Sequence, residues 1–125
     1  MSKEIKNFDL EERLIDFAVH VIRVAESMPK SRLGNHIAGQ LIRCGTAPAP
    51  NYGEAQSAES RSDFIHKMKI SLKELRETRI WLLLIARADI IKYKLIEFLI
   101  DENNQLISIF VASVKTARRN QRKTS

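Results

Sequence analysis

Residues 39–59 have the sequence GQLIRCGTAPAPNYGEAQSAE, in which small residues predominate and two prolines, Pro48 and Pro50, stand two positions apart. Long patterns typical of amphipathic helices lie on both sides of this segment. Small residues let two backbones approach closely, whereas bulky side chains would hold them apart. The segment therefore predicts a tight crossing of helices.

Two helical patterns surround this crossing. The first begins at Asp9, which can cap the helix together with Glu12 in a capping box, and it stops before Pro29. The second begins near Ser31 and should kink or break between residues 45 and 51, because each proline removes a backbone donor and crowds the carbonyl four residues earlier. We expect helix to resume after this break. The positions expected to face the core are Leu10, Leu14, Phe17, Ala18, Val21, Ala25, Met28, Leu33, Ile37, Leu41 and Cys44.

Two further helical patterns complete the chain. The third starts at Ser60, where Asp63 repeats the capping arrangement, and runs to about residue 88. The fourth covers roughly residues 92–119, with Asn103 and Asn104 loosening one turn. Their expected core positions are Phe64, Met68, Leu72, Leu75, Leu82 and Ala86, then Leu95, Phe98, Leu99, Leu106, Ile109, Phe110 and Ser113. Without strand-like alternation or internal repeats, this order predicts an all-α, up-and-down four-helix bundle.

Two apolar surfaces exceed what a single bundle can bury. Residues 80–86, IWLLLIA, are apolar on every side of the third helix, and four helices cannot surround one of their own number. In the first helix Ile15, Val19 and Ile22 widen the apolar arc well beyond ~100°. We therefore expect copies of the chain to form a homo-oligomer. The predicted interface residues are Ile80, Trp81, Leu83 and Leu84.

Composition limits the class of protein and its surroundings. The 125 residues, 44% hydrophobic and 29% charged, fit one globular domain. The single cysteine, Cys44, cannot form an intramolecular disulfide, and the first residues, MSKEIK, hold no apolar run of signal-peptide length. The longest uncharged apolar run, residues 80–86, is far shorter than the ~20 residues of a membrane span. We expect a cytoplasmic protein that does not cross a membrane.

The net charge of +6 is concentrated near the C-terminus. Residues 103–125 contain five basic residues and no acidic one, so the rest of the chain is nearly neutral. No apolar residue follows Ala117, and a segment of this kind cannot bury enough surface to order itself, so we expect it to fray. The predicted organisation is an N-terminal extension at 1–8, a bundle at 9–119 and a basic C-terminal segment at 120–125.

Four short motifs in a fixed order resemble those of a known family. They are Gln40-Leu-Ile-Arg43, Asn51-x-x-Glu54, Ser62-Asp63-Phe64 and Ser71-x-x-Glu74-x-x-x-Thr78. Their order and spacing resemble the bacterial four-helix-bundle proteins called 23S ribosomal RNA intervening-sequence proteins, from about Leu14 to Ser113. Pro48, Pro50 and Ala55 depart from the pattern of that family and put the continuity of the second helix in question.

The resemblance implies a homopentamer of four-helix bundles, encoded inside insertions in bacterial ribosomal RNA genes or as free-standing genes. The family has no established biochemical role. A similar protein, the accessory variability determinant of diversity-generating retroelements, is a basic pentamer that associates with nucleic acid and a reverse transcriptase. The resemblance therefore implies RNA or DNA, and a reverse transcriptase or another protein encoded nearby, as partners.

Two groups of basic residues are candidates for contact with phosphates. Lys69, Lys73, Arg76 and Arg87 fall within about 60° of one another around the third helix, with His66 at the edge. Repeated in an oligomer, they would form a basic belt without base selectivity; alternatively, they form a solvated face balanced by Asp63 and Glu77. The second group follows Val114, and its alternative role is to complement the negative end of the fourth helix. It consists of Lys115, Arg118, Arg119, Arg122 and Lys123.

Several polar residues fall in or beside the packing segments of the helices. They are Arg43, Asn51, Glu54, Ser71, Glu74, Thr78 and Arg79. Two carboxylates near an arginine suit general acid chemistry, but a glutamate that points into a bundle must be paired or protonated, so we favour a structural polar network. The expected pairs are Arg43 with Glu54, or Arg79 with Glu74. Glu102, on the apolar side of the fourth helix, also needs a partner, which the sequence does not identify.

No catalytic, metal or cofactor site is predicted. His20, His36 and His66 show no spacing suited to a metal, and Cys44 among small residues is expected to be a buried apolar group. The glycines match neither a dinucleotide fingerprint nor a phosphate loop. The sequence thus favours a non-enzymatic oligomeric adaptor that presents a basic surface to RNA or DNA. The alternatives are a protein-binding scaffold and, third, an enzyme with an accessible and unpaired Glu54 or Glu74.

Overall fold

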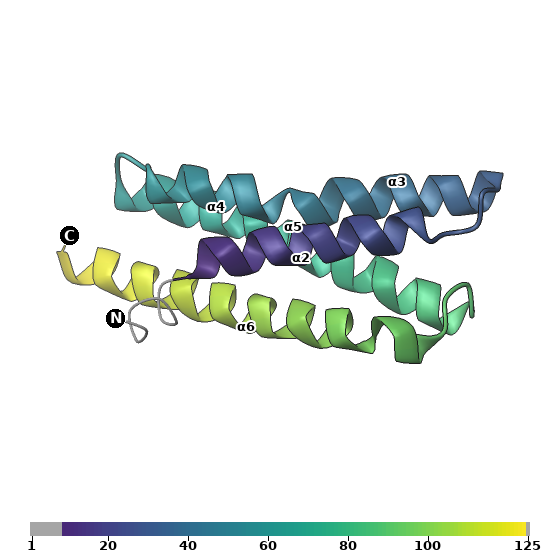
Figure 1. The fold of residues 1–125 in the computed structure, drawn as a ribbon. Helices are drawn as coiled ribbons and strands as arrows, with labels where there is room; N and C mark the ends of the chain where they lie inside the picture. Colours follow the sequence, from purple (N-terminus) through teal and green to yellow (C-terminus); the bar gives the residue numbers. More distant parts are fainter. Residues whose placement is uncertain (1–8, 125) are drawn as a thin grey trace.

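The structure of the protein is a computed structural model that describes residues 9–124, which are helical apart from short turns (Figure 1). Its elements are α2 (Leu10–Glu26), α3 (Arg32–Thr46), α4 (Pro48–Gln56), α5 (Arg61–Arg87) and α6 (Tyr93–Thr124). In Figure 1, α3 and α4 continue one another along one side of the molecule. Together they form one leg of the bundle, by which we mean one of the four helical segments that run along its length. The four legs alternate in direction, as expected for an up-and-down four-helix bundle.

The predicted helix starts at Ser31 and Ser60 are confirmed. Ser31 Oγ accepts a hydrogen bond from the Gly34 amide at 3.1 Å, and Ser60 Oγ accepts one from the Asp63 amide at 3.0 Å. The predicted capping box at Asp9 is wrong, because the Asp9 side chain makes no capping hydrogen bond. A capping residue needs an extended backbone, and Asp9 has φ −96° and ψ 38°.

The predicted interruption at the prolines is confirmed, and it occupies a single residue. Helix α3 ends at Thr46 and α4 begins at Pro48, while Ala47 between them keeps helical angles of φ −70° and ψ −35°. The interruption therefore leaves the direction of the leg unchanged. A proline at the first position of a helix is tolerated because the amide that it lacks would have no partner there.

The predicted close crossing is found between α2 and α3. Gly45 is buried, and a Cβ atom placed on it would lie 2.6 Å from Cγ1 and 2.8 Å from Cγ2 of Val21. The Val21 side chain occupies the space beside the Gly45 backbone and leaves no room for a side chain at position 45, so the glycine sets the distance between the helices. Gly39, one and a half turns earlier on α3, has no neighbouring atom within 4 Å of such a Cβ.

The core runs through the centre of the four legs, and its largest fully buried side chains come from each of them, among them Phe17, Leu41, Leu75 and Phe110. Helix α2 packs against α3, α4 and α6, and α5 packs against the same three helices. Helices α2 and α5 therefore occupy opposite corners of the bundle, and in Figure 1 α2 lies in front of α5. Their outer surfaces point in opposite directions.

Three expected core residues are exposed instead. Leu33 and Leu95 lie in the first turns of α3 and α6, where the neighbouring legs provide too little surface to cover them, and Phe98 follows one turn after Leu95. The Phe98 ring is 52% exposed and meets the His20 ring at a steep angle, with 5.1 Å between ring centroids. Helical spacing identifies a face of a helix but not how far along the helix its neighbours reach.

The expected fraying after Ala117 is wrong for the described residues. Helix α6 continues to Thr124, and Gln121 Nε2 donates a hydrogen bond to Ser62 Oγ at 2.6 Å, which fastens the end of α6 to the start of α5. Extending an existing helix adds one hydrogen bond for each residue fixed, so a long helix continues through a polar segment that would not form a helix alone. The predicted extension at residues 1–8 lies outside the described residues.

Candidate nucleic-acid interface

The two predicted basic groups lie on adjoining helices. Helices α5 and α6 are antiparallel neighbours, and Arg79 Nε donates to Asn104 Oδ1 at 3.2 Å about midway along them. Together with the bond between Gln121 and Ser62, this contact places the C-terminal half of α6 beside the N-terminal half of α5. Exposed cationic residues of this region include Lys69, Lys73 and Arg76 on α5 and Lys115, Arg118, Arg119 and Arg122 on α6. We call these seven residues the basic face.

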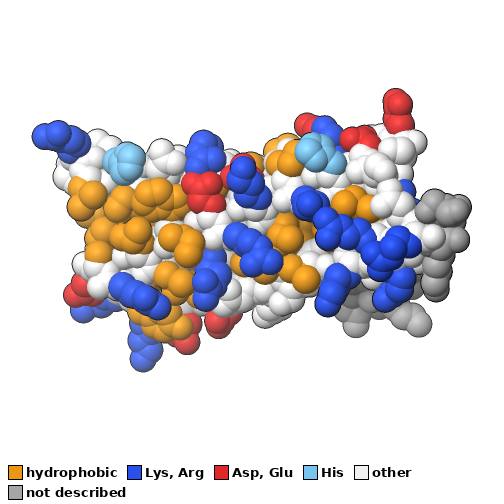
Figure 2. All heavy atoms as spheres, turned by 180° about the vertical axis from the view of Figure 1, so that it is seen from behind, with side chains coloured by type: hydrophobic (Ala, Val, Ile, Leu, Met, Phe, Trp, Pro, Cys, Tyr) orange, Lys and Arg blue, Asp and Glu red, His pale blue; other side chains and the backbone are white. Residues whose placement is uncertain are grey.

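Figure 2 views the bundle from the side of α5. Lys and Arg side chains spread over the centre of this view and over the end where α5 begins, whereas hydrophobic side chains gather at the opposite end. The α6 segment 104–122 contributes no acidic residue. Glu77, proposed as a partner for these cations, accepts hydrogen bonds from Arg43 and from Trp81 Nε1 instead. The positive charge of the basic face is therefore not balanced by the carboxylate of Glu77.

Arg87 is separated from the other predicted phosphate contacts. It lies at the last turn of α5, where it lines a surface hollow together with Ile80, Leu83, Leu84 and Ala88. About three turns of helix lie between Arg76 and Arg87. The structure thus places Arg87 at the edge of the apolar area and not within the basic face.

The predicted interface residues divide into two kinds. Ile80 and Leu84 are 55% and 43% exposed, while Trp81 and Leu83 are half-buried. The Trp81 ring packs edge-on against His36, with 6.1 Å between ring centroids, and thus belongs to the packing of α3 on α5. The apolar segment 80–86 is therefore covered on one side by its own bundle and open on the other.

Three of the predicted polar residues, Arg43, Glu54 and Glu74, form ion pairs, but with other partners than expected. Arg43 bonds Glu74 at 3.4 Å and also Glu77, which ties α3 to α5, while Glu54 on α4 pairs with Lys67 on α5 at 2.8 Å. The expected pair of Arg43 with Glu54 is wrong, because both residues lie on the same leg, about 16 Å apart along its axis. The pair of Arg79 with Glu74 is also wrong, because five residues along a helix turn the side chains about 140° apart. Asn51 lies outside this network.

Glu102 has a partner that the sequence did not reveal. Arg13 on α2 donates through Nε and Nη2 to the two carboxylate oxygens of Glu102, both at 2.8 Å, and Nη2 also donates to Gln105 Oε1. These hydrogen bonds raise the pKa of Arg13 above its ordinary value. A bidentate ion pair of this kind fixes the position of α2 along α6, because both hydrogen bonds form only in one orientation of the guanidinium and the carboxylate.

Asn103 was expected to loosen a turn of α6, but the helix passes through it unbroken. Its side chain is fully buried, and Nδ2 donates to the Leu75 carbonyl at 3.3 Å. The Oδ1 atom has no hydrogen-bond partner. Asn103 therefore joins α6 to α5 at one height along the bundle.

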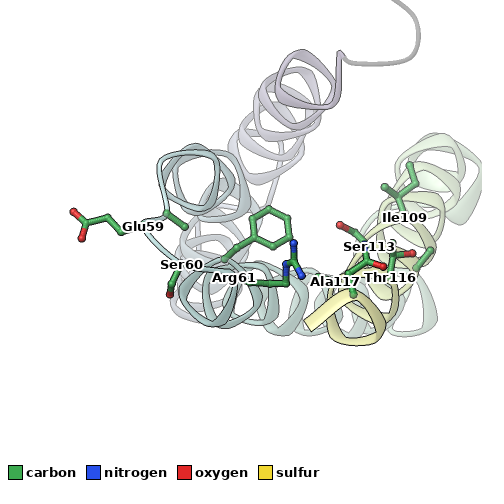
Figure 3. A pocket seen from close by; sticks show the side chains of 11 residues that line it. Glu59, Ser60, Arg61, Ile109, Ser113, Thr116 and Ala117 are labelled. Carbon is green, nitrogen blue, oxygen red and sulfur yellow. The ribbon is translucent and has the colours of Figure 1, made fainter. Parts of the chain in front are cut away.

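A surface hollow of about 960 Å³ lies between the turn joining α4 to α5 and the second half of α6 (Figure 3). Figure 3 shows Arg61 on one side of the hollow and Ser113 and Thr116 on the other, while the Glu59 carboxylate points away from it. Neither Glu54 nor Glu74 lines this hollow, and both are engaged in ion pairs. The hollow brings together no pair of carboxylates that could exchange protons with a substrate.

Two further features concern metals and membranes. Among residues 9–122, no three His, Cys, Asp or Glu side chains are grouped so that they could hold a metal ion. None of the described helices has an apolar stretch long enough to cross a membrane.

Cys44 is fully buried and free, as predicted, and its Sγ lies 3.7 Å from the Leu41 carbonyl oxygen. Burial raises the pKa of the thiol, so the reactive thiolate forms only at higher pH than for an exposed cysteine. We expect Ellman's reagent to leave the native protein unmodified at pH 8 and to modify one thiol after unfolding in guanidinium. As a matched control, Gly39→Cys in a Cys44→Ala background places an exposed thiol on the same helix and should react at once. Rapid modification of native Cys44 would contradict its burial.

Comparison with known proteins places the chain in a family. The family model described as 23S rRNA-intervening sequence protein matches residues 6–112. The chain belongs to the 23S rRNA-intervening sequence protein family. The resemblance of the motifs between Gln40 and Thr78 to this family is thereby confirmed, while the cations of α6, from Lys115 onwards, follow the matched range.

A solved structure agrees with this assignment to the 23S rRNA-intervening sequence proteins. It is a protein with unknown function from the S23 ribosomal protein family of Bacteroides thetaiotaomicron VPI-5482. The two chains are 28% identical and superpose with a TM-score of 0.79, over 84% of this chain and 97% of that one. The comparison with curated proteins gave no match.

Proposed function

We propose that the protein is a non-enzymatic, self-associating adaptor of the cytoplasm whose basic face binds the phosphates of RNA or DNA without sequence specificity. The observation that carries this proposal is the grouping of seven exposed cations on two adjoining helices, with Glu77 engaged elsewhere. Cations that neutralise phosphates release condensed counterions, and this release drives sequence-independent binding. The family resemblance adds the expectation of five subunits, which would repeat the face around the assembly.

The same face lacks the features that read a base sequence. Specific recognition of single strands commonly uses aromatic rings on which bases stack, and α5 and α6 carry none between Phe64 and Trp81 or after Phe110. Contacts to phosphate fix the position of a protein on nucleic acid without selecting a sequence. We therefore expect similar affinities for unrelated sequences of the same nucleic acid.

The test is binding of purified protein to unrelated RNA and duplex DNA at about 50 and 200 mM salt. We expect the triple variant Lys69→Glu, Lys73→Glu, Arg76→Glu to lose at least about tenfold in affinity at the lower salt, and the slope of log affinity against log salt to fall by up to about three. The triple variant Lys115→Glu, Arg118→Glu, Arg119→Glu should act in the same direction.

The matched control replaces three exposed cations around the turn from α2 to α3 by glutamate, namely Arg23, Lys30 and Arg32. It changes the net charge by the same amount, so equal losses from control and test variants would show that only total charge matters. Undetectable binding of the unchanged protein at low salt, or binding unaffected by both test variants, would remove the proposal.

A protein-binding scaffold is the second candidate, and the hollow in Figure 3 favours it. Phe64, Ile109 and Ala117 give this hollow an apolar wall on which a partner side chain could pack. The partner would be a protein encoded nearby, such as a reverse transcriptase. Binding of this partner should survive nuclease treatment and be lost in the Ile109→Arg variant. Loss of binding on nuclease treatment would show that nucleic acid bridges the two proteins.

A further inference from the structure

The outer surface of α2 carries an apolar strip with an acidic residue at each end. Ile15, Val19 and Ile22 are 40%, 39% and 38% exposed, and Glu12 and Glu26 lie beyond them on the same side of the helix. These five side chains fall within about 80° of one another by helical geometry. Glu26 follows fourteen residues after Glu12, a distance of about 21 Å along the helix.

The outer surface of α5 carries an apolar strip with basic residues at each end. Ile80 and Leu84 are exposed, and Lys73, Arg76 and Arg87 lie beyond them, again within about 80° around the helix. Lys73 and Arg87 are also fourteen residues apart, or about 21 Å. The two strips therefore match in length and have opposite charge at both ends.

The end charges have no partners within the described part of their own chain. The ion pairs among residues 9–122 use Arg13, Arg43 and Lys67 as cations, and neither Glu12 nor Glu26 contributes a carboxylate to them. All five end residues are exposed to solvent. The charges are free to pair with another molecule.

We propose that the α2 strip of one copy packs against the α5 strip of a second copy, with Glu12 opposite Lys73, Val19 opposite Ile80 and Glu26 opposite Arg87. The α2 strip and the α5 strip would thus be the surfaces through which copies associate in the proposed function. This contact does not involve nucleic acid. Burial of five exposed apolar side chains supplies the attraction, and the end charges select the orientation.

Helices α2 and α5 start at the same end of the molecule and run in the same direction (Figure 1), so the two strips are parallel. Arg13 on α2 pairs with Glu102, and Asn103, the next residue of the antiparallel α6, bonds the Leu75 carbonyl on α5, which gives an offset of about 63 residues between α2 and α5. Through α3 and α4, where Gly45 lies against Val21 and Ser71 bonds the Pro48 carbonyl, the offset is about 53. The proposed pairs have an offset of 61, which lies between these two values.

The two strips give a head-to-tail contact between copies. Because α2 and α5 lie at opposite corners of the bundle, each copy joins two neighbours through different surfaces. Such head-to-tail contacts close into a ring when successive copies are related by rotation without translation, and form fibres otherwise. A two-fold contact between parallel α5 helices would bring Arg76 and Arg87 against their own copies, which opposes association.

The experiment is a charge exchange, measured as mass by light scattering at micromolar concentration without nucleic acid. We expect Glu12→Lys with Glu26→Lys, and separately Lys73→Glu with Arg87→Glu, to shift the protein toward the single-subunit mass of 14.4 kDa. The quadruple variant restores opposite charges across every interface and should regain the mass of the unchanged protein. Circular dichroism confirms that each variant is folded.

The matched control is Leu95→Glu, an exposed apolar residue of α6 outside both strips, which should leave the mass unchanged. An unchanged protein of single-subunit mass would overturn both this interface and the self-association of the proposed function. An oligomer that keeps its mass in both double variants, or a folded quadruple variant that stays dissociated, would overturn this interface alone. Binding to nucleic acid is measured separately with the α6 variant and does not enter this test.

Discussion

Replacing Gly45 by valine should lower the free energy of unfolding by about 3 kcal/mol, the upper end of the usual cost of overpacking a core. The new Cβ would lie 2.6 and 2.8 Å from the methyl carbons of Val21, and 3.1 Å from its Cβ. Val21 is fully buried, so it cannot turn away. Helices α2 and α3 would have to separate along the crossing that the small residues create.

The measurement is urea denaturation followed by circular dichroism at one fixed protein concentration, because self-association makes the apparent stability depend on concentration. Gly39→Ala is the matched control on the same helix. Nothing lies within 4 Å of its new Cβ, so the better helix propensity of alanine should raise stability by about 1 kcal/mol. If Gly45→Val unfolded at the same urea concentration as the unchanged protein, the close crossing would be absent.

The features that were predictable from sequence are those fixed within one helix. Serine caps at Ser31 and Ser60 act on an amide three residues later, and a proline disturbs its own turn, so neighbouring residues suffice to locate them. The exposure of Lys69 and Lys73 follows from the 3.6-residue repeat in the same way. The predicted cap at Asp9 is wrong because the backbone conformation of this residue depends on how the chain enters the bundle.

The pairing of particular side chains on different helices was not predictable. The pairing of Arg13 with Glu102 joins residues 89 positions apart, and it depends on the height at which α2 stands against α6. Composition and periodicity give the faces of helices but not their relative shifts. The same limit explains why the sequence identified Glu54 and Glu74 as needing partners yet assigned the wrong ones.

The proposed interface and the basic face share residues, and this has consequences for both tests. Lys73 and Arg76 belong to both sets, so a neighbour seated on α5 would remove part of the basic face from contact with phosphates. Lys69 and the cations of α6 would then contact nucleic acid. We therefore expect the α6 variant, Lys115→Glu with Arg118→Glu and Arg119→Glu, to lower nucleic-acid affinity without changing the mass of the oligomer.

The second large effect is expected for Phe110→Ala, which should lower the free energy of unfolding by about 3 to 5 kcal/mol. Phe110 is fully buried in α6, and its ring meets Tyr52 of α4 edge-on at 6.0 Å between centroids. Truncation removes most of the side chain and leaves a cavity that the surrounding helices can close only partly. The packing that is lost lies in the half of α6 that carries Lys115, Arg118 and Arg119.

Phe98→Ala is the matched control, because Phe98 lies on the same helix but is 52% exposed. It should cost less than about 1 kcal/mol, since most of its ring already meets water. Urea denaturation of both variants at equal protein concentration measures the difference, and equal losses would contradict the assignment of Phe110 to the core. Destabilisation should also make the C-terminal half of α6 exchange its amide hydrogens faster than the α5 segment around Leu82, because that half loses the ring contact with Tyr52.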